Sequence, residues 1–196
     1  MTPHKQIDHT SLRQKIDLRQ WAIAELGGLD QTRVLELFGG TGVLYDACYH
    51  GAAEHLSIDC ADRPGTNRLQ GDNRILLPSV METEWNLFDA DSYSNPWAVL
   101  TDVCRLREPG RFLAVVTCGI LRGLKNGYSN AFIRTRIGFH DLRPAPLLNR
   151  WYDDVIRWVL HDWNGFQITV ERAVRITPKR FPPSEVTYWG LILRKE

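Results

Sequence analysis

Four acidic residues stand at places where a folded chain could bring them together. Glu36, Asp59, Asp72 and Asp91 each lie at or just after the end of a segment that is predicted to form a β-strand. The carboxyl ends of parallel strands meet at one edge of an open α/β sheet, and ligands bind outside that edge where the strand order reverses. The four acids together therefore predict a site for a nucleotide-like ligand, although each alone is also typical of a turn or a helix cap.

A glycine-rich turn follows the first of these acids. The segment Phe38-Gly39-Gly40-Thr41-Gly42 comes after an apolar run and predicts a sharp turn from a buried strand into a helix. Glycine permits backbone conformations that a Cβ forbids and lets a bound cofactor approach the main chain closely. The dinucleotide fingerprint G-x-G-x-x-G is excluded, because Tyr45 stands where its last glycine would be.

The segment from Glu36 to Gly42 resembles the first motif of class I S-adenosylmethionine-dependent methyltransferases. The resemblance implies S-adenosylmethionine as the cofactor, with Glu36 holding its methionine end directly or through water. It also implies further cofactor contacts, which we assign to Phe38, Gly39, Gly40, Thr41, Gly42, Asp59, Asp72 and Asp89. An acid at the position of Asp59 can accept hydrogen bonds from two ribose hydroxyls. For Asp72, contact with the adenine amine and capping of the helix after it stay open as alternatives.

The methyl acceptor is predicted by the segment Asp91-Ser92-Tyr93-Ser94-Asn95-Pro96. This segment, preceded by Asp89, resembles the D-P-F/Y-G-S-P segment of tRNA guanine N2,N2-dimethyltransferases, with Ser92 in place of proline and Ser94 in place of glycine. The resemblance implies transfer of a methyl group to an exocyclic amine. Asp91 and the Ser92 carbonyl are expected to accept N–H bonds from that amine. Tyr93 is expected either to stack on a flat substrate ring or to pack against the core beneath the loop.

Other functions remain open at the level of sequence. Cys118 ends a predicted strand where RNA cytosine-C5 methyltransferases place a nucleophile, but their second signature, a P-C dipeptide, is absent and a buried, inert thiol is expected. A small-molecule methyltransferase and a degenerate, non-catalytic binding module are the alternatives. The basic stretch Arg122–Arg150 favours a nucleic-acid substrate, although a solvated face also explains it.

The elements expected to position these residues alternate between strands and helices. Strands are predicted over 33–38, 55–59, 67–70, 85–89 and 111–117, followed by an antiparallel pair near 166–170 and 186–193. Helices are predicted over 11–26, 43–50, 73–84, 97–107, 130–139 and 151–163. The order indicates a Rossmann-like, doubly wound α/β fold: a mostly parallel seven-stranded sheet that ends in an antiparallel β-hairpin, with helices on both faces.

Composition limits the class of protein. A chain of 196 residues suits one domain, which we divide into an N-terminal helix region (1–28), a cofactor-binding half (29–118) and a substrate-side half (119–196). No apolar run is long enough for a membrane span, and the first residues lack the apolar core of a signal peptide. The cysteines form no metal-binding spacing, so no metal and a cytoplasmic location are expected.

Overall fold

The computed structural model describes residues 11–62, 67–92, 96–119, 164–176 and 186–196. Its strands are β1 Arg33–Glu36, β2 Glu54–Asp59, β3 Arg68–Gln70, β4 Leu87–Asp91, β5 Gly110–Cys118, β6 Ile168–Ile176 and β7 Thr187–Lys195. Its helices are α1 Leu12–Glu25, α2 Asn73–Val80 and α3 Trp97–Leu106, together with the short segments η1 Leu29–Gln31, η2 Tyr45–Tyr49 and η3 Asn164–Phe166. The predicted helices at 130–139 and 151–163 lie outside the described residues.

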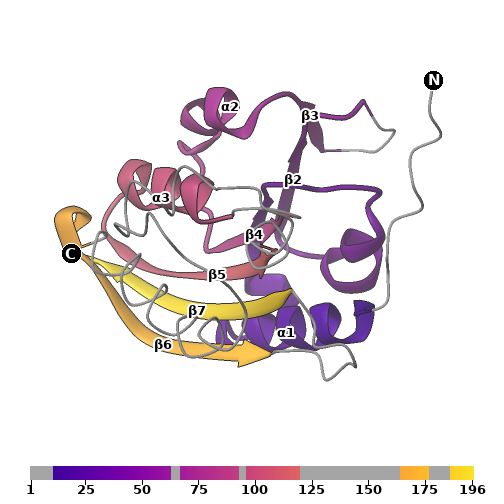
Figure 1. Ribbon diagram of the computed structural model, residues 1–196, viewed down its shortest axis with the longest axis horizontal. Coiled ribbons are helices and arrows are strands. Elements are labelled where there is room, and N and C mark those ends of the chain that lie inside the picture. Colours follow the sequence, from indigo (N-terminus) through magenta and orange to yellow (C-terminus); the bar gives the residue numbers. More distant parts are fainter. Residues whose placement is uncertain (1–10, 63–66, 93–95, 120–163, 177–185) are drawn as a thin grey trace, which may run out of the picture.

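A single seven-stranded sheet organises the chain, in the order β3-β2-β1-β4-β5-β7-β6 (Figure 1). The first five strands in this order are parallel, and β7 pairs antiparallel with both β5 and β6. This arrangement confirms the predicted doubly wound sheet with a hairpin at one edge. The order reverses between β1 and β4, so the carboxyl ends of these two strands mark the place where a ligand is expected.

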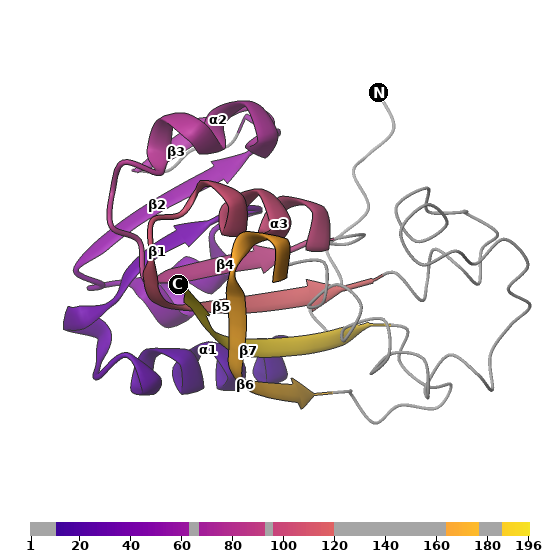
Figure 2. The same cartoon turned by 90° about the vertical axis from the view of Figure 1, so that its left-hand side faces the viewer.

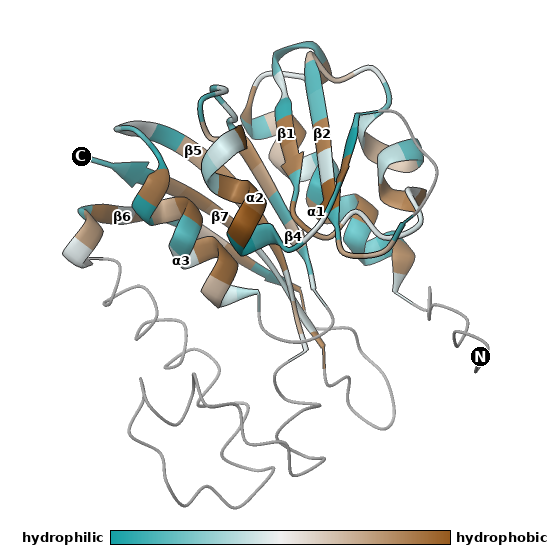
Figure 3. Cartoon of the chain, turned by 90° about the horizontal axis from the view of Figure 1, so that it is seen from above, coloured by the Kyte–Doolittle hydropathy of each residue, from teal (hydrophilic) through white to brown (hydrophobic). Residues whose placement is uncertain are grey.

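Helices cover both faces of the sheet. Helix α1 packs on β5 and β7 together with η2, whereas α2 and α3 pack against each other on the opposite face (Figure 2). Strand β5 serves both layers, because Phe112 and Ala114 face the α2 and α3 side while Leu113 and Val115 face the α1 side. A strand buried on both faces is apolar almost throughout, and brown, apolar segments accordingly mark the central strands in Figure 3.

Several element boundaries differ from the prediction. Helix α2 ends at Val80 rather than at Glu84, since the indole N–H of Trp85 donates to the Val80 carbonyl at 2.8 Å and the chain turns there. Strand β4 continues to Asp91, because its ladder with β5 extends to the pair of Asp91 and Thr117. Asp89 therefore lies inside the strand. No helix among the described residues is long and apolar enough to cross a membrane.

The helix ends also depart from simple capping rules. Ser11 precedes α1, but its side chain makes no capping hydrogen bond. The predicted helix after the glycine turn is present, yet Tyr45–Tyr49 is a π-helical turn in which the His50 N–H donates to the Tyr45 carbonyl at 3.0 Å. Such turns frequently occur at functional sites. Here the wide turn contains Tyr49, which reaches into the interior.

Candidate active site

The glycine turn connects the end of β1 to the helix that contains η2. Gly40 and Gly42 have φ values of 53° and 84°, a region that L side chains rarely adopt. Gly39 is needed for a different reason, because a Cβ there would lie 1.7 Å from the Ser57 hydroxyl oxygen. Of the other predicted turn residues, Phe38 packs against the core and Thr41 is exposed. The turn thus has the conformation that its sequence predicts.

Asp59 holds this turn in place from the end of β2. Its Oδ2 accepts the Gly40 N–H at 2.8 Å, and its Oδ1 accepts the Ala61 N–H at 2.8 Å. Arg68, at the start of β3, donates to the Gly40 carbonyl at 2.6 Å and lies 3.7 Å from the Asp59 carboxylate. A carboxylate has about four acceptor positions, so Asp59 keeps capacity for hydroxyl groups beyond these two backbone bonds.

Glu36 is buried at the end of β1 and is bound by a histidine. Its Oε2 lies 2.6 Å from Nε2 of His55 on β2, and the Tyr45 ring packs on the imidazole with centroids 4.3 Å apart. Burial raises the pKa of Glu36 above its ordinary value, and the bond to His55 only partly opposes this effect. The Glu36 side chain is 4% exposed, so little of its carboxylate is open to a ligand.

Asp89 lies in a fully buried ionic cluster beneath the turn. Arg19 of α1 donates to both Asp89 oxygens at 2.6 Å, and the Tyr49 hydroxyl donates to Oδ2 at 2.8 Å. Burial raises the pKa of Asp89, whereas Asp89 raises that of Arg19; the paired short contacts favour the charged, bidentate form. Burial also raises the pKa of Tyr49, so its phenol keeps the proton that it donates. Asp89 is thus occupied by partners from within the chain.

Asp91 ends β4, two residues beyond this cluster. Its Oδ2 accepts a hydrogen bond from the Lys15 ammonium of α1 at 2.7 Å, and its Oδ1 is buried with no hydrogen-bond partner among the described residues. Burial would raise the pKa of Asp91, but the charges of Arg19 and Lys15, together with hydrogen bonding from Lys15 and Thr117, outweigh it and hold the pKa below its ordinary value. The carboxylate is therefore ionised at neutral pH. Ser92, the next residue, is buried.

The remaining predicted residues fall in two groups. Asp72 caps α2, since its Oδ1 accepts the Arg74 N–H at 2.8 Å and bonds to the backbone and side chain of Arg74 lower its pKa. The capping role is therefore present, and contact with adenine stays a prediction. Tyr93 and the basic stretch Arg122–Arg150 lie outside the described residues.

Cys118 ends β5 and is completely buried. The Trp97 indole N–H donates to its sulfur at 3.3 Å, which is a packing arrangement rather than that of an exposed nucleophile. We expect Cys118→Ser to retain methyl transfer within about twofold of the wild type, because a serine hydroxyl can accept the same N–H bond. Cys60→Ser, at an exposed cysteine, is the matched control. A loss of activity at unchanged thermal stability, seen in Cys118→Ser alone, would indicate covalent catalysis.

Comparisons with known proteins bear on the fold. No protein-family model matches the sequence, and no curated protein matches it either. Solved structures do match. TYW2 from M. jannaschii in complex with AdoMet has a TM-score of 0.59 at 10% identity, over 98% of this chain and 80% of that chain. The N-methyltransferase NodS from Bradyrhizobium japonicum, in complex with S-adenosyl-L-homocysteine, has a TM-score of 0.53 at 11% identity, over 94% and 87%.

A third structure, the cyclopropane synthase MmaA2 from Mycobacterium tuberculosis, has a TM-score of 0.55 at 11% identity, over 97% of this chain and 87% of that chain. The sheet order and these three likenesses agree. The chain has the Rossmann-like fold that these three structures share. In this fold, Glu36, Asp59 and Asp91 end β1, β2 and β4 at the carboxyl edge of the parallel strands, as predicted.

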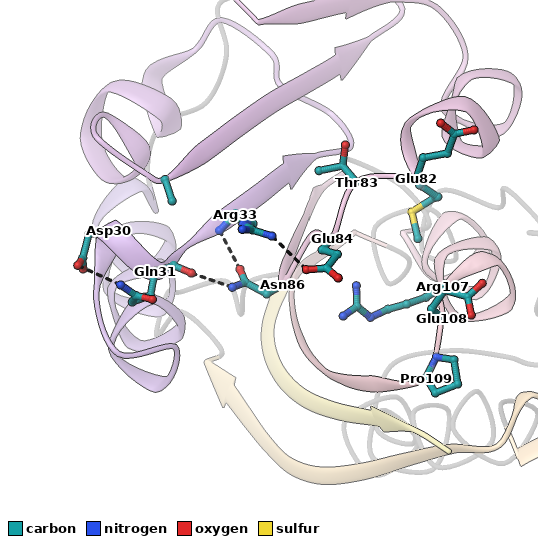
Figure 4. Close-up of a pocket in the computed structure, with 12 residues that line it drawn as sticks. Asp30, Gln31, Arg33, Glu82, Thr83, Glu84, Asn86, Arg107, Glu108 and Pro109 are labelled. Atoms are coloured by element: carbon teal, nitrogen blue, oxygen red, sulfur yellow. Dashed lines mark hydrogen bonds and ion pairs between the residues drawn. The ribbon is translucent and has the colours of Figure 1, made fainter.

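A pocket of about 620 Å³ lies at the opposite edge of the methyltransferase sheet (Figure 4). It is bordered by residues that precede β1 and β4, among them Gln31 and Glu84. Arg33 pairs with Glu84 at 3.2 Å, and the Asn86 amide donates to the Gln31 carbonyl at 2.8 Å. The polar groups along this wall thus bond to one another. The carboxyl edge remains the candidate active site of the fold.

Four site residues were not predicted from the sequence: Lys15, Arg19, His55 and Arg68. Lys15 and Arg19 are four residues apart, and this spacing indicates that they share one face of α1. Nothing in the spacing shows that this face is turned inward, because charged residues are almost never fully buried unless they are paired. His55 is the second residue of β2 and Arg68 the first residue of β3, and their partners follow only from strand pairing.

Proposed function

We propose that this chain is an S-adenosylmethionine-dependent N-methyltransferase whose acceptor is an exocyclic amine of a nucleic-acid base. The observation that carries the proposal is Asp91: an ionised carboxylate at the switch point of the sheet, whose buried Oδ1 makes no hydrogen bond of good geometry to the described residues and has only the Thr117 hydroxyl on the neighbouring strand to interact with. Buried polar atoms in folded proteins are nearly always hydrogen-bonded. Oδ2 already accepts an N–H bond from Lys15, and an amine N–H of the acceptor is a donor that Oδ1 can bind.

The residues around the turn fit the cofactor. A Cβ at Gly42 would meet no atom within 4 Å, and one at Gly40 would meet a single backbone oxygen at 3.9 Å, so the main chain of the turn can be approached closely. Asp59 has acceptor capacity for ribose hydroxyls. We assign Glu36 an indirect, water-mediated contact with the methionine end, because its carboxylate is already bound to His55.

The chemistry follows from the charge that develops on the acceptor. S-adenosylmethionine, when bound, supplies a methyl group activated by a sulfonium. The amine nitrogen gains positive charge as it attacks, and the Asp91 carboxylate stabilises that charge while it orients the N–H bonds. The Ser92 carbonyl is proposed to accept a second N–H bond, and Tyr93 to stack on the base. Because the pKa of Asp91 is low, we expect it to orient the amine rather than to remove its proton.

Two measurements test this function in sequence. Calorimetry with S-adenosylmethionine should show binding; no heat over a range of temperatures would favour the degenerate binding module. Transfer of a labelled methyl group should then be measured with total tRNA, rRNA, DNA, nucleosides and small amines as acceptors. The proposal predicts label on a base amine. Label confined to a small molecule that lacks a nucleobase would support the small-molecule alternative.

Asp59 provides a separate test of the cofactor site. We expect Asp59→Ala to weaken S-adenosylmethionine binding by about 10- to 100-fold, since hydrogen bonds to charged groups contribute about 1.5–3 kcal/mol and the glycine turn loses its anchor. Asp62→Ala, at an exposed acid three residues on, is the matched control. Calorimetric dissociation constants compare the two. If Asp59→Ala and Asp62→Ala bound S-adenosylmethionine with equal affinity, Asp59 would not be a cofactor-binding residue.

A further inference from the structure

Helix α1 places a lysine at the acceptor end of the site. The Lys15 ammonium lies 2.7 Å from Asp91 Oδ2, across 76 residues of sequence, and both side chains are largely buried at 13% and 15% exposure. One turn further along α1, Arg19 donates to the Lys15 carbonyl at 2.9 Å, which joins this contact to the buried cluster. The lysine is therefore a built part of the site rather than a surface charge.

Among the described residues, the charges near Asp91 come from more than one element. Helix α1 contributes Lys15 and Arg19, β4 contributes Asp89, and these last two neutralise each other through their bidentate contact. Glu36 of β1 is bound to His55, and the protonated Tyr49 of η2 donates to Asp89. On β5 the residue in register with Asp91 is Thr117, which is uncharged. Arg19 and Lys15 both lower the pKa of Asp91, but Arg19 is shared with Asp89, so among the described residues Lys15 is the cation that bonds to Asp91 directly.

This balance determines which amines the site can use. A carboxylate without a nearby cation attracts an alkylammonium and favours its protonated form, yet a protonated amine has no lone pair with which to attack a methyl group. A carboxylate already balanced by Lys15 gains little from a second cation, but its second oxygen still accepts a neutral N–H bond. Exocyclic amines of nucleobases are neutral at pH 7, whereas alkylamines are charged.

We propose that Lys15 is a specificity-determining residue, which by pairing with Asp91 selects neutral, base-type amines and rejects alkylammonium groups. This inference rests on the proposed function and narrows its acceptor to a chemical class. Lys15 acts through Asp91 and is not itself a catalytic residue.

The test compares Lys15→Met with Arg13→Met, which removes a cation from the same helix where the side chain is 90% exposed. Spermidine binding to the full chain is followed by calorimetry, and the Asp91 carboxyl is titrated by carbon NMR with aspartate labelling. In Lys15→Met, Asp91 should titrate at higher pH, and spermidine should bind about tenfold more tightly. A tenfold change in affinity corresponds to an interaction that shifts a pKa by about one unit. Lys15→Arg should restore both, and Lys15→Met with Asp91→Asn should abolish the gain.

Two results would overturn the inference: spermidine affinity and Asp91 titration unchanged in a folded Lys15→Met protein, or faster methyl transfer by the wild type to spermidine than to any nucleic acid. If Lys15→Met does not fold, Lys15→Gln repeats the comparison with a polar side chain. Spermidine binding and the titration of Asp91 are both measured without the cofactor. A failure to bind S-adenosylmethionine would therefore count against the proposed function alone.

Discussion

Asp91→Asn is expected to lower kcat for methyl transfer by about 10²- to 10³-fold, the usual cost of removing one preorganised electrostatic group from an active site. The amide cannot offer the acceptor amine a full negative charge, and it presents an NH₂ group to the Lys15 ammonium. Affinity for S-adenosylmethionine should stay close to that of the wild type, because the glycine turn and Asp59 are untouched. Single-turnover kinetics with labelled cofactor separate these two effects.

The control for this substitution is Asp30→Asn, at an exposed acid at the opposite edge of the sheet. It should leave kcat unchanged. Thermal unfolding of Asp91→Asn shows whether the protein is still folded at the assay temperature. Full activity of folded Asp91→Asn would show that Asp91 does not take part in methyl transfer and that the acceptor binds at another place.

Arg19→Met is expected to cost about 3–5 kcal/mol of unfolding free energy, which is the effect of removing one partner from a buried ion pair. Methionine fills much of the same volume, but Asp89 keeps its charge in the interior with the Tyr49 hydroxyl as its remaining donor among the described residues. The loss is large beside the 5–15 kcal/mol that holds a typical domain together. Urea denaturation at pH 7 measures it.

Two variants identify the cause of that loss. Arg13→Met, on the exposed side of the same helix, should change the unfolding free energy by less than about 0.5 kcal/mol. Arg19→Met combined with Asp89→Asn should be more stable than Arg19→Met alone, because the uncompensated carboxylate is gone. If the double variant were no more stable than the single one, packing rather than charge would explain the effect of Arg19.

The fold could be predicted from the sequence because its signals are local. The apolar run of β5 and the glycines after β1 each indicate their own structure from a few neighbouring residues, and the alternation of strands and helices then indicates the sheet. Boundaries were less accurate where distant contacts decide them. Val80 ends α2 because Trp85 donates to its carbonyl, and Asp91 belongs to β4 because Thr117 lies beside it.

The acids of the site could be predicted, but not what binds them. A carboxylate at the end of a strand is visible in the sequence, whereas its partner comes from another element: Lys15 for Asp91, Arg19 for Asp89 and His55 for Glu36. These partners change the chemistry. Asp89 is occupied by Arg19 and Tyr49, and the pKa of Asp91 is lowered rather than raised despite its burial.

The position of β7 has a consequence for the order in which the sheet is assembled. The block from β3 to β5 is complete in sequence by Cys118, yet the free edge of β5 is covered by a strand that begins at Thr187. In the sheet, β6 pairs with β7 alone, so it cannot join before β7 does. During synthesis an apolar β5 edge therefore stays open while dozens of residues are added, which makes this edge the natural site for chaperone binding or misassociation.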